Sequence, residues 1–309
     1  PGKIPVVMIH GLWSSPLTWM EMFNDLRSDP QLRDHYQYWF YLYPTGQPFW
    51  LSASKFREDM AEMRARIDPE HTRSELDQMV LVGHSMGGLI SQMLTLDSGD
   101  RLWKSVSGKP VDELQVSPDV KSEIQRVFFF QSNPSIDRIV TISTPYGGSS
   151  FSNRFTSWLS GSFIWLPAKT YELTKVVFEQ NNSSWWDRVT APRTSVDSLT
   201  SKSAVLRLIR DSRVPDDVKH HNIVSIRRGT AQDSWTDGVV AFGSAHRDDV
   251  TSEKVVKAGH SEVLRNSETV AEVRRILLEH LQETRQRRFP VVPVRRTVAA
   301  SVDEESARD

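Results

Sequence analysis

Short apolar runs alternate along this chain with segments of helical periodicity, and this alternation limits the possible folds more than any other feature. Ile4–Ile9 is a continuous apolar run that precedes Gly11. Such a run is typical of a strand that is buried on both faces. Residues 15–27 follow with apolar side chains spaced by three, as in an amphipathic helix. The order of strand, helix, strand, helix favours a mainly parallel sheet with helices on both faces.

The same alternation continues to about residue 284. Further strands are predicted over 38–43, 79–82, 139–142, 222–226 and 253–256, and further helices over 54–67, 86–96 and 267–284. We therefore predict one α/β domain over residues 1–285, with a sheet of about six strands. Residues 286–309, which lead through a Pro/Val stretch to an acidic end, are predicted to form a flexible tail.

Composition excludes several classes of protein. The 38 basic and 39 acidic side chains give a net charge of −1, which offers no electrostatic basis for binding nucleic acid. No apolar run is long enough for a transmembrane helix. The absence of cysteine excludes disulfides, thiolate metal sites and a cysteine nucleophile. The chain opens Pro1-Gly2-Lys3 without Met, so we expect a trimmed or mature fragment whose localisation and partner proteins stay open.

One long segment interrupts the alternation. Residues 147–200 hold four of the ten tryptophans, together with Phe151, Phe155 and Phe163, and show no strand pattern. This segment is predicted to be an inserted cap or lid. Its aromatic side chains are expected to form a small core of their own, to face a substrate, or to do both.

The strongest local motif is Gly83-His84-Ser85-Met86-Gly87-Gly88, between the strand over 79–82 and the helix over 86–96. A serine at such a tight strand-to-helix turn is held in a strained backbone, and glycines stand two residues before and after it because neighbouring backbone leaves no room for side chains. The turn exposes the hydroxyl and points the amide groups of the helix N-terminus at an oxyanion beside it. Ser85 is therefore the candidate nucleophile, and Gly83 and Gly87 support it.

A serine hydroxyl needs a base, and the chain has nine histidines. His260 lies between the last strand and the last helix, at the same carboxyl edge of the sheet as Ser85. It is favoured over His246, and surface or packing roles are expected for His35, His71, His220, His221 and His280. His84 is expected to point away from Ser85.

The third candidate is a carboxylate that orients the histidine. Asp237, in Thr236-Asp237-Gly238, follows the strand over 222–226. The chain order Ser85, Asp237, His260 is the one typical of α/β-hydrolases. Asp233 is the rival, whereas Asp248 and Asp249 are interpreted as solvated loop charges.

An oxyanion hole is predicted where His10-Gly11-Leu12 follows the first strand. The backbone N–H groups of Leu12 and Met86 are its two expected donors, with His10 and Gly11 forming the supporting loop.

Together these motifs resemble the α/β-hydrolase superfamily, in its lipase/esterase branch, from Ile4 to about Leu281. Thr144-Pro145-Tyr146-Gly147-Gly148-Ser149 is similar to the threonine-proline-histidine-x-glycine-serine run of bacterial lipases, except that Tyr146 stands where that branch usually has histidine. The start of the chain also lacks the antiparallel strands that open larger members.

The resemblance implies a serine hydrolase that cleaves carboxylic esters through Ser85, Asp237 and His260, on a small-molecule or lipid ester. No cofactor and no metal are expected, because no motif for either is present. Thioesterase, amidase and acyltransferase reactions use the same residues and stay open as alternatives. A non-catalytic binding protein on the same fold is a further alternative, which the complete set of candidate residues disfavours.

Overall fold

The computed structural model describes residues 2–148, 198–199, 201, 203–227 and 235–288. The described strands are β1 (Ile4–Ile9), β2 (Tyr36–Tyr41), β3 (Met79–His84), β4 (Ile136–Ile142), β5 (Lys219–Ile226) and β6 (Ser252–Lys257). They form one sheet in the order β2-β1-β3-β4-β5-β6, and every neighbouring pair is parallel. The predicted parallel sheet of about six strands is confirmed.

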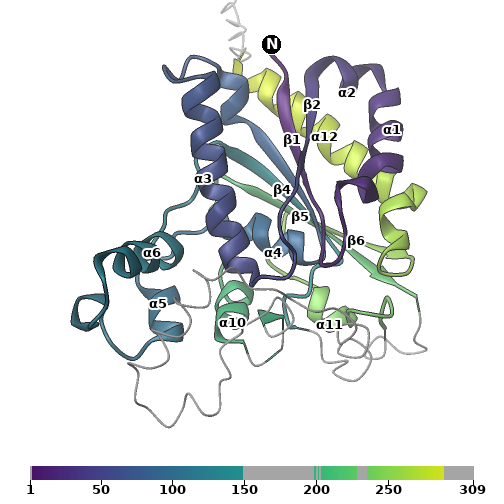
Figure 1. Cartoon of the computed structure of the whole chain (residues 1–309). Helices are drawn as coiled ribbons and strands as arrows, with labels where there is room; N and C mark the ends of the chain where they lie inside the picture. The colour runs from purple at the N-terminus through teal and green to yellow at the C-terminus, as the bar shows by residue number, and fades with distance from the viewer. Residues whose placement is uncertain (1, 149–197, 200, 202, 228–234, 289–309) are drawn as a thin grey trace, which may run out of the picture.

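Helices cover both faces of this sheet (Figure 1). The α-helices are α1 (Met20–Ser28), α2 (Pro30–His35), α3 (Phe49–Ile67), α4 (Met86–Met93), α5 (Arg101–Val106), α6 (Pro118–Phe128), α10 (Ala204–Arg210), α11 (Phe242–Ala245) and α12 (Ser267–Arg288). Short 3-10 helices span Pro16–Trp19, Ser74–Asp77, Val111–Glu113 and Glu262–Arg265. None of the described helices is long and apolar enough to cross a membrane.

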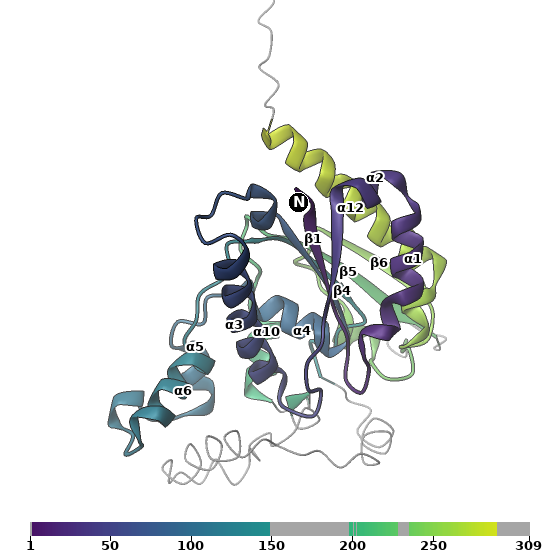
Figure 2. The ribbon, with the colours of Figure 1, turned by 45° about the horizontal axis from the view of Figure 1, so that its top comes forward.

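Two apolar cores divide the helices between the faces. Apolar side chains of α3, α4 and α6 pack with Val7, Ile9 and Leu81 on one face, whereas those of α1 and α12 pack with Val6 and Met8 on the other. Figure 2 shows the same two layers, with α1, α2 and α12 together on one side of the strands. Because successive β1 residues point to opposite faces, a continuous apolar run buries side chains in both cores.

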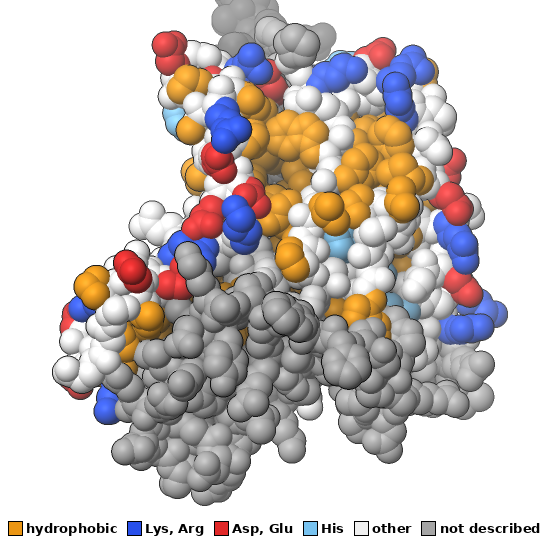
Figure 3. Space-filling view, viewed as in Figure 1, with side chains coloured by type: hydrophobic (Ala, Val, Ile, Leu, Met, Phe, Trp, Pro, Cys, Tyr) orange, Lys and Arg blue, Asp and Glu red, His pale blue; other side chains and the backbone are white. Residues whose placement is uncertain are grey.

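The two edges of the sheet differ in chemistry. Tyr38, Trp39, Phe40 and Tyr41 of edge strand β2 are partly buried aromatics without a charge among them. Figure 3 shows hydrophobic side chains gathered on this face of the molecule, between α3 and the α1–α2 pair. The opposite edge strand, β6, has charged side chains along it, a common way to keep an edge strand from pairing with another chain.

Several predicted boundaries are wrong. Strand β2 begins and ends two residues earlier than predicted, since its pairing with β1 stops at the pair Ile9 and Tyr41. Helix α3 begins at Phe49 rather than at residue 54. Helix α12 ends at Arg288 rather than at about residue 284. The predicted tail beyond Arg288, and all of the predicted cap but its ends, lie outside the described residues.

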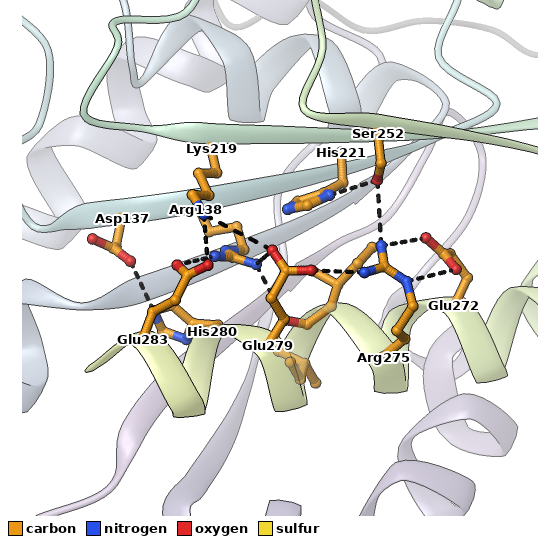
Figure 4. Close-up of polar contacts among 12 residues, drawn as sticks. Asp137, Arg138, Lys219, His221, Ser252, Glu272, Arg275, Glu279, His280 and Glu283 are labelled. Carbon is orange, nitrogen blue, oxygen red and sulfur yellow. Dashed lines mark hydrogen bonds and ion pairs between the residues drawn. The ribbon is translucent and has the colours of Figure 1, made fainter. Parts of the chain in front are cut away.

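The amino ends of β4 and β5 are joined to α12 by charged side chains (Figure 4). Arg138 of β4 is fully buried, and its guanidinium donates to Glu279 at 3.2 Å and to Glu283 at 2.6 Å. Lys219 of β5 donates to the same Glu283. A buried guanidinium is costly unless it is paired, so these acids on α12 compensate for burying Arg138 and fix the helix across the sheet.

Two histidines, for which surface or packing roles are predicted, lie in β5. His220 and His221 are buried; His220 Nε2 lies 2.9 Å from Thr141 Oγ1, and His221 Nδ1 lies 2.7 Å from Ser252 Oγ. Burial, helped by the charge of Arg247 near His220 and of Arg138 near His221, lowers the pKa of both to about 3. Both are therefore neutral in the folded protein at neutral pH.

We predict that acid destabilises the fold through these two side chains. Between pH 6.5 and about 3 the unfolded chain binds protons on both histidines and the folded chain does not. The free energy of unfolding should fall by up to about 2.7 kcal/mol per pH unit from the pair as the pH drops below 6.5. Urea denaturation at pH 7 and 5.5 measures this, and His221→Asn should remove about half of the pair's contribution. If the free energy of unfolding changed equally with pH in His221→Asn and in the parent, buried His221 would not be the source of the pH dependence.

Candidate active site

Ser85 lies at a sharp turn between β3 and α4, as the sequence predicts. Its backbone has φ 54° and ψ −123°, a conformation that non-glycine residues rarely adopt and that stores strain. The strain persists because the Ser85 amide donates to Ile142 O at 2.8 Å and its carbonyl accepts from Gly88 N at 3.0 Å. The turn holds the Ser85 side chain at the carboxyl edge of the sheet.

The glycines around Ser85 are required by contact with backbone. A Cβ on Gly83 would lie 2.4 Å from Gly87 O, and a Cβ on Gly87 would lie 2.2 Å from Ile9 O. Both distances are far below van der Waals contact. A Cβ on Gly88 would lie 1.9 Å from Thr144 Oγ1, so this third glycine is needed for α4 to approach the end of β4.

His260 lies between Ser85 and Asp237, and all three side chains are buried. Its Nε2 is 3.0 Å from Ser85 Oγ, and its Nδ1 is 2.7 Å from Asp237 Oδ2. An ionised carboxylate only accepts hydrogen bonds, so Nδ1 has the proton and Nε2 accepts from the serine hydroxyl. The loop is also joined through backbone, because His260 N donates to Asp237 O at 3.2 Å.

Asp237 is held as a carboxylate. Its Oδ1 accepts from the amides of Val239 at 2.8 Å and Val240 at 2.7 Å, and its Oδ2 accepts from His260 and from Ser225 Oγ at 2.9 Å. Burial by itself would raise the pKa of this carboxyl, but the neighbouring His260 and these hydrogen bonds outweigh it and lower the pKa. Asp237 is thus a buried anion next to His260.

His246, the rival base, does not join this group. His246 pairs instead with Glu253 at 2.6 Å and Asp248 at 2.9 Å, and the hydrogen bond to Glu253 raises its pKa. Asp233 lies outside the described residues. The interpretation of Asp249 as a solvated loop charge is wrong. Arg247 donates two hydrogen bonds to its carboxylate, at 2.8 and 2.6 Å.

The loop after β1 lies against Ser85. A Cβ on Gly11 would be 2.9 Å from Ser85 Cβ, so only glycine lets the two backbones approach this closely. His10 is buried and its ring stacks on Tyr43 at 4.6 Å, while the Tyr43 hydroxyl donates to His10 O at 2.6 Å. Burial lowers the pKa of His10 and outweighs the hydrogen bond to Gly11 O, which raises it. The ring is therefore neutral at neutral pH and supports the loop.

Two backbone amides near Ser85 are candidate hydrogen-bond donors. The amides of Leu12, directly after Gly11, and of Met86, the first residue of α4, have no hydrogen-bond partner among the described residues. The Met86 amide also belongs to the helix N-terminus, where the helix dipole favours negative charge. Together they could bind an oxygen anion that forms next to Ser85.

His84 is a site residue whose role the sequence prediction left undefined. Its Nε2 lies 2.8 Å from His260 O, and the rings of the two histidines are 4.9 Å apart. Burial, together with the neighbouring His260, lowers the pKa of His84 to about 3, so His84 is neutral and donates this hydrogen bond. His84 thereby fixes the backbone of the loop that holds His260.

Ser225 and Tyr146 also go beyond the sequence prediction. Ser225 interrupts the apolar run Ile223-Val224-Ser225-Ile226, a signal that could have marked it as functional. Tyr146, which replaces the histidine of the similar lipase run, is buried with its hydroxyl 3.2 Å from His220 Nε2 and Arg247 over its ring. It lies outside the group of Ser85, His260 and Asp237.

Within the described ranges, no three His, Asp or Glu side chains are grouped so that they could hold a metal ion. The arrangement is suited to proton transfer from a serine hydroxyl to an imidazole, and two unpaired backbone amides belong to the adjoining loop and helix.

Comparisons with known proteins relate the whole domain to one family. A model of the alpha/beta hydrolase family matches residues 6–273. EstA from Clostridium botulinum is 14% identical with a TM-score of 0.55, over 89% of this chain and 87% of that chain. The propeptide form of the Bacillus licheniformis lipase BlEst2 is 17% identical with a TM-score of 0.50, over 90% of this chain and 50% of that chain. Such identities show a similar fold and no more. Among curated protein sequences no match is found.

Proposed function

This chain belongs to the alpha/beta hydrolase family, and from that premise we propose that it is a serine hydrolase that cleaves carboxylic esters through an acyl-enzyme intermediate. One observation supports this most directly. His260 lies within hydrogen-bond distance of Ser85 Oγ through one ring nitrogen and of Asp237 Oδ2 through the other. A serine, a base and an orienting carboxylate in this order are what nucleophilic acyl transfer requires.

In the first half-reaction, Ser85 Oγ attacks the ester carbonyl carbon while its proton moves to His260 Nε2. Asp237 stabilises the imidazolium that forms and stays ionised itself. The carbonyl oxygen becomes an oxyanion, which the Leu12 and Met86 amides stabilise. His260 then gives its proton to the departing alcohol oxygen, which leaves an acyl group on Ser85.

The second half-reaction repeats these steps with water. His260 Nε2 removes a proton from water, whose oxygen attacks the acyl carbon. The tetrahedral intermediate collapses, and the proton on His260 returns to Ser85 Oγ as the acid leaves. The proposed cycle thus needs Ser85, His260, Asp237 and the two amides, and each returns to its starting state.

For the substrate we propose a small-molecule or lipid ester. Leu12 and Trp13 are apolar residues in the loop that lies against Ser85, and this supports an apolar acyl group near the nucleophile. The predicted cap would add further aromatic side chains, from a segment almost entirely outside the described residues.

A series of p-nitrophenyl esters from acetate to palmitate tests this proposal. We expect hydrolysis by the wild-type protein, with kcat/KM rising from acetate towards medium or long chains because an apolar site gains binding energy with each methylene. Activity that is highest on acetate would contradict the apolar acyl site but not the serine mechanism. No hydrolysis of any ester would contradict ester cleavage as the function.

A further inference from the structure

Two buried serine hydroxyls form a row that ends at Asp237, on the carboxylate oxygen that His260 also contacts. Ser143 directly follows β4 and Ser225 lies near the end of β5; both are almost fully buried. Ser143 Oγ is 2.5 Å from Ser225 Oγ, and Ser225 Oγ is 2.9 Å from Asp237 Oδ2. Neither hydroxyl makes a hydrogen bond to Ser85 or His260 among the described residues.

The direction of the hydrogen bonds in this row follows from the chemistry of Asp237. Its ionised carboxylate can only accept, so the Ser225 proton points at Oδ2. The Ser225 oxygen is then left as the acceptor of the short contact, and Ser143 is its donor. Both hydroxyl dipoles therefore point at the carboxylate, and each strengthens the next.

Ser225 completes the set of donors around Asp237. The amides of Val239 and Val240 occupy Oδ1, and His260 and Ser225 share Oδ2. With two donors on each oxygen, the carboxylate plane is fixed and Oδ2 stays directed at His260 Nδ1. Without Ser225, one face of this buried oxygen is unsatisfied and the carboxylate can turn towards the two amides.

The same turn after β4 also holds the nucleophile. Ile142 O accepts the Ser85 amide at 2.8 Å, and the next residue, Ser143, donates its own amide to Ile223 O at 2.8 Å. Ser143 has φ 52°, a left-handed backbone at a non-glycine residue. This strained turn thus connects the backbone of Ser85 to the side chain of Ser143, which is hydrogen-bonded to Ser225.

We propose that Ser225, backed by Ser143, is a positioning residue that orients the Asp237 carboxylate against His260. The inference rests on the proposed serine mechanism and adds to it two residues on neighbouring strands. Ser225 acts through Asp237 and does not touch substrate. Ser143 acts only through Ser225, so the losses of kcat from replacing the two serines are not expected to multiply.

The test compares Ser225→Ala, Ser143→Ala and the double variant in the full chain. Ser225→Ala should lower kcat by about 10- to 100-fold at nearly unchanged KM, since a hydrogen bond to a buried charge is lost. Ser143→Ala should cost about 3- to 10-fold. The double variant should match Ser225→Ala alone, because Ser143 has no route to Asp237 once Ser225 is gone.

The matched control is Ser212→Ala. Ser212 is also buried, but its hydroxyl donates to Leu208 O, away from the site. Removing it deletes a buried serine hydroxyl without touching Asp237, so kcat should stay at the wild-type value. Thermal unfolding of all variants shows whether each is folded at the assay temperature.

Two further readouts separate this inference from the proposed function. The rate at which a fluorophosphonate labels Ser85 should fall in Ser225→Ala as kcat does, whatever the natural substrate is. The low-field proton resonance of His260 Nδ1 should move in Ser225→Ala and stay in place in Ser212→Ala, even in a protein without turnover. Wild-type kcat, labelling and resonance in a folded Ser225→Ala would overturn the inference, as would losses that multiply in the double variant. A wild-type protein that neither hydrolyses esters nor reacts with the probe would overturn the proposed function instead.

Discussion

Replacing Ser85 with alanine should lower kcat for p-nitrophenyl ester hydrolysis by about 10⁶-fold. The hydroxyl is the atom that forms the acyl-enzyme, and within the described part of the chain no other serine lies within hydrogen-bond distance of His260. Only the stabilisation by the Leu12 and Met86 amides and by substrate binding would remain, which is typically worth about 10³ to 10⁴ over water. Initial rates at saturating ester, with active enzyme counted by burst titration of the parent, measure the loss.

The variant is also expected to keep its fold. Ser85 N and Ser85 O make backbone hydrogen bonds to Ile142 and Gly88, which alanine retains. Circular dichroism and the Tm should therefore match the wild type closely. A folded Ser85→Ala protein with more than about one per cent of the wild-type kcat would exclude Ser85 as the nucleophile.

Replacing His260 with alanine should have an effect of similar size, about 10⁵- to 10⁶-fold on kcat, since the proton of Ser85 then has no acceptor. The matched control is His246→Ala, which removes the histidine that the sequence left as the rival base. His246 is paired with Glu253 and Asp248, so its loss should leave kcat close to the wild-type value. The same initial-rate assay measures both variants.

One result of comparing the two histidine variants would contradict the assignment of His260 as the base. If His246→Ala lost activity as severely as His260→Ala, the base would have been assigned to the wrong loop. A variant with both substitutions would then serve only to show which histidine contributes more to kcat. Retention of activity in His260→Ala would contradict the assignment more directly still.

The sheet could be predicted from sequence because buried parallel strands have a distinct local signal. Ile4–Ile9 and Met79–His84 are apolar on both faces and end at glycine-containing turns, so their limits are visible along the chain. The first residues of α3 gave no such signal. Phe49 to Ser54 are all buried, and a helical turn that is buried all round has no polar face to reveal its period.

The site was predictable in part for the same reason. Ser85, Asp237 and His260 each follow a strand, and the carboxyl ends of parallel strands meet at one edge of the sheet. The hydrogen bonds of Ser225 and the burial of His220 depend on partners that are distant in sequence. His220 meets Thr141, 79 residues away, through the pairing of β4 with β5, and no local pattern encodes that register.

The measurement that tests the central claim most directly is the reaction of the wild-type protein with a fluorophosphonate, followed by peptide mapping. An activated serine is phosphonylated whatever its natural acyl substrate, because the reagent requires only the nucleophile, its base and the oxyanion donors. We predict a single adduct on Ser85, absent from Ser85→Ala and from His260→Ala and present in His246→Ala. A folded wild-type protein without any adduct, or with the adduct on a different serine, would contradict the account.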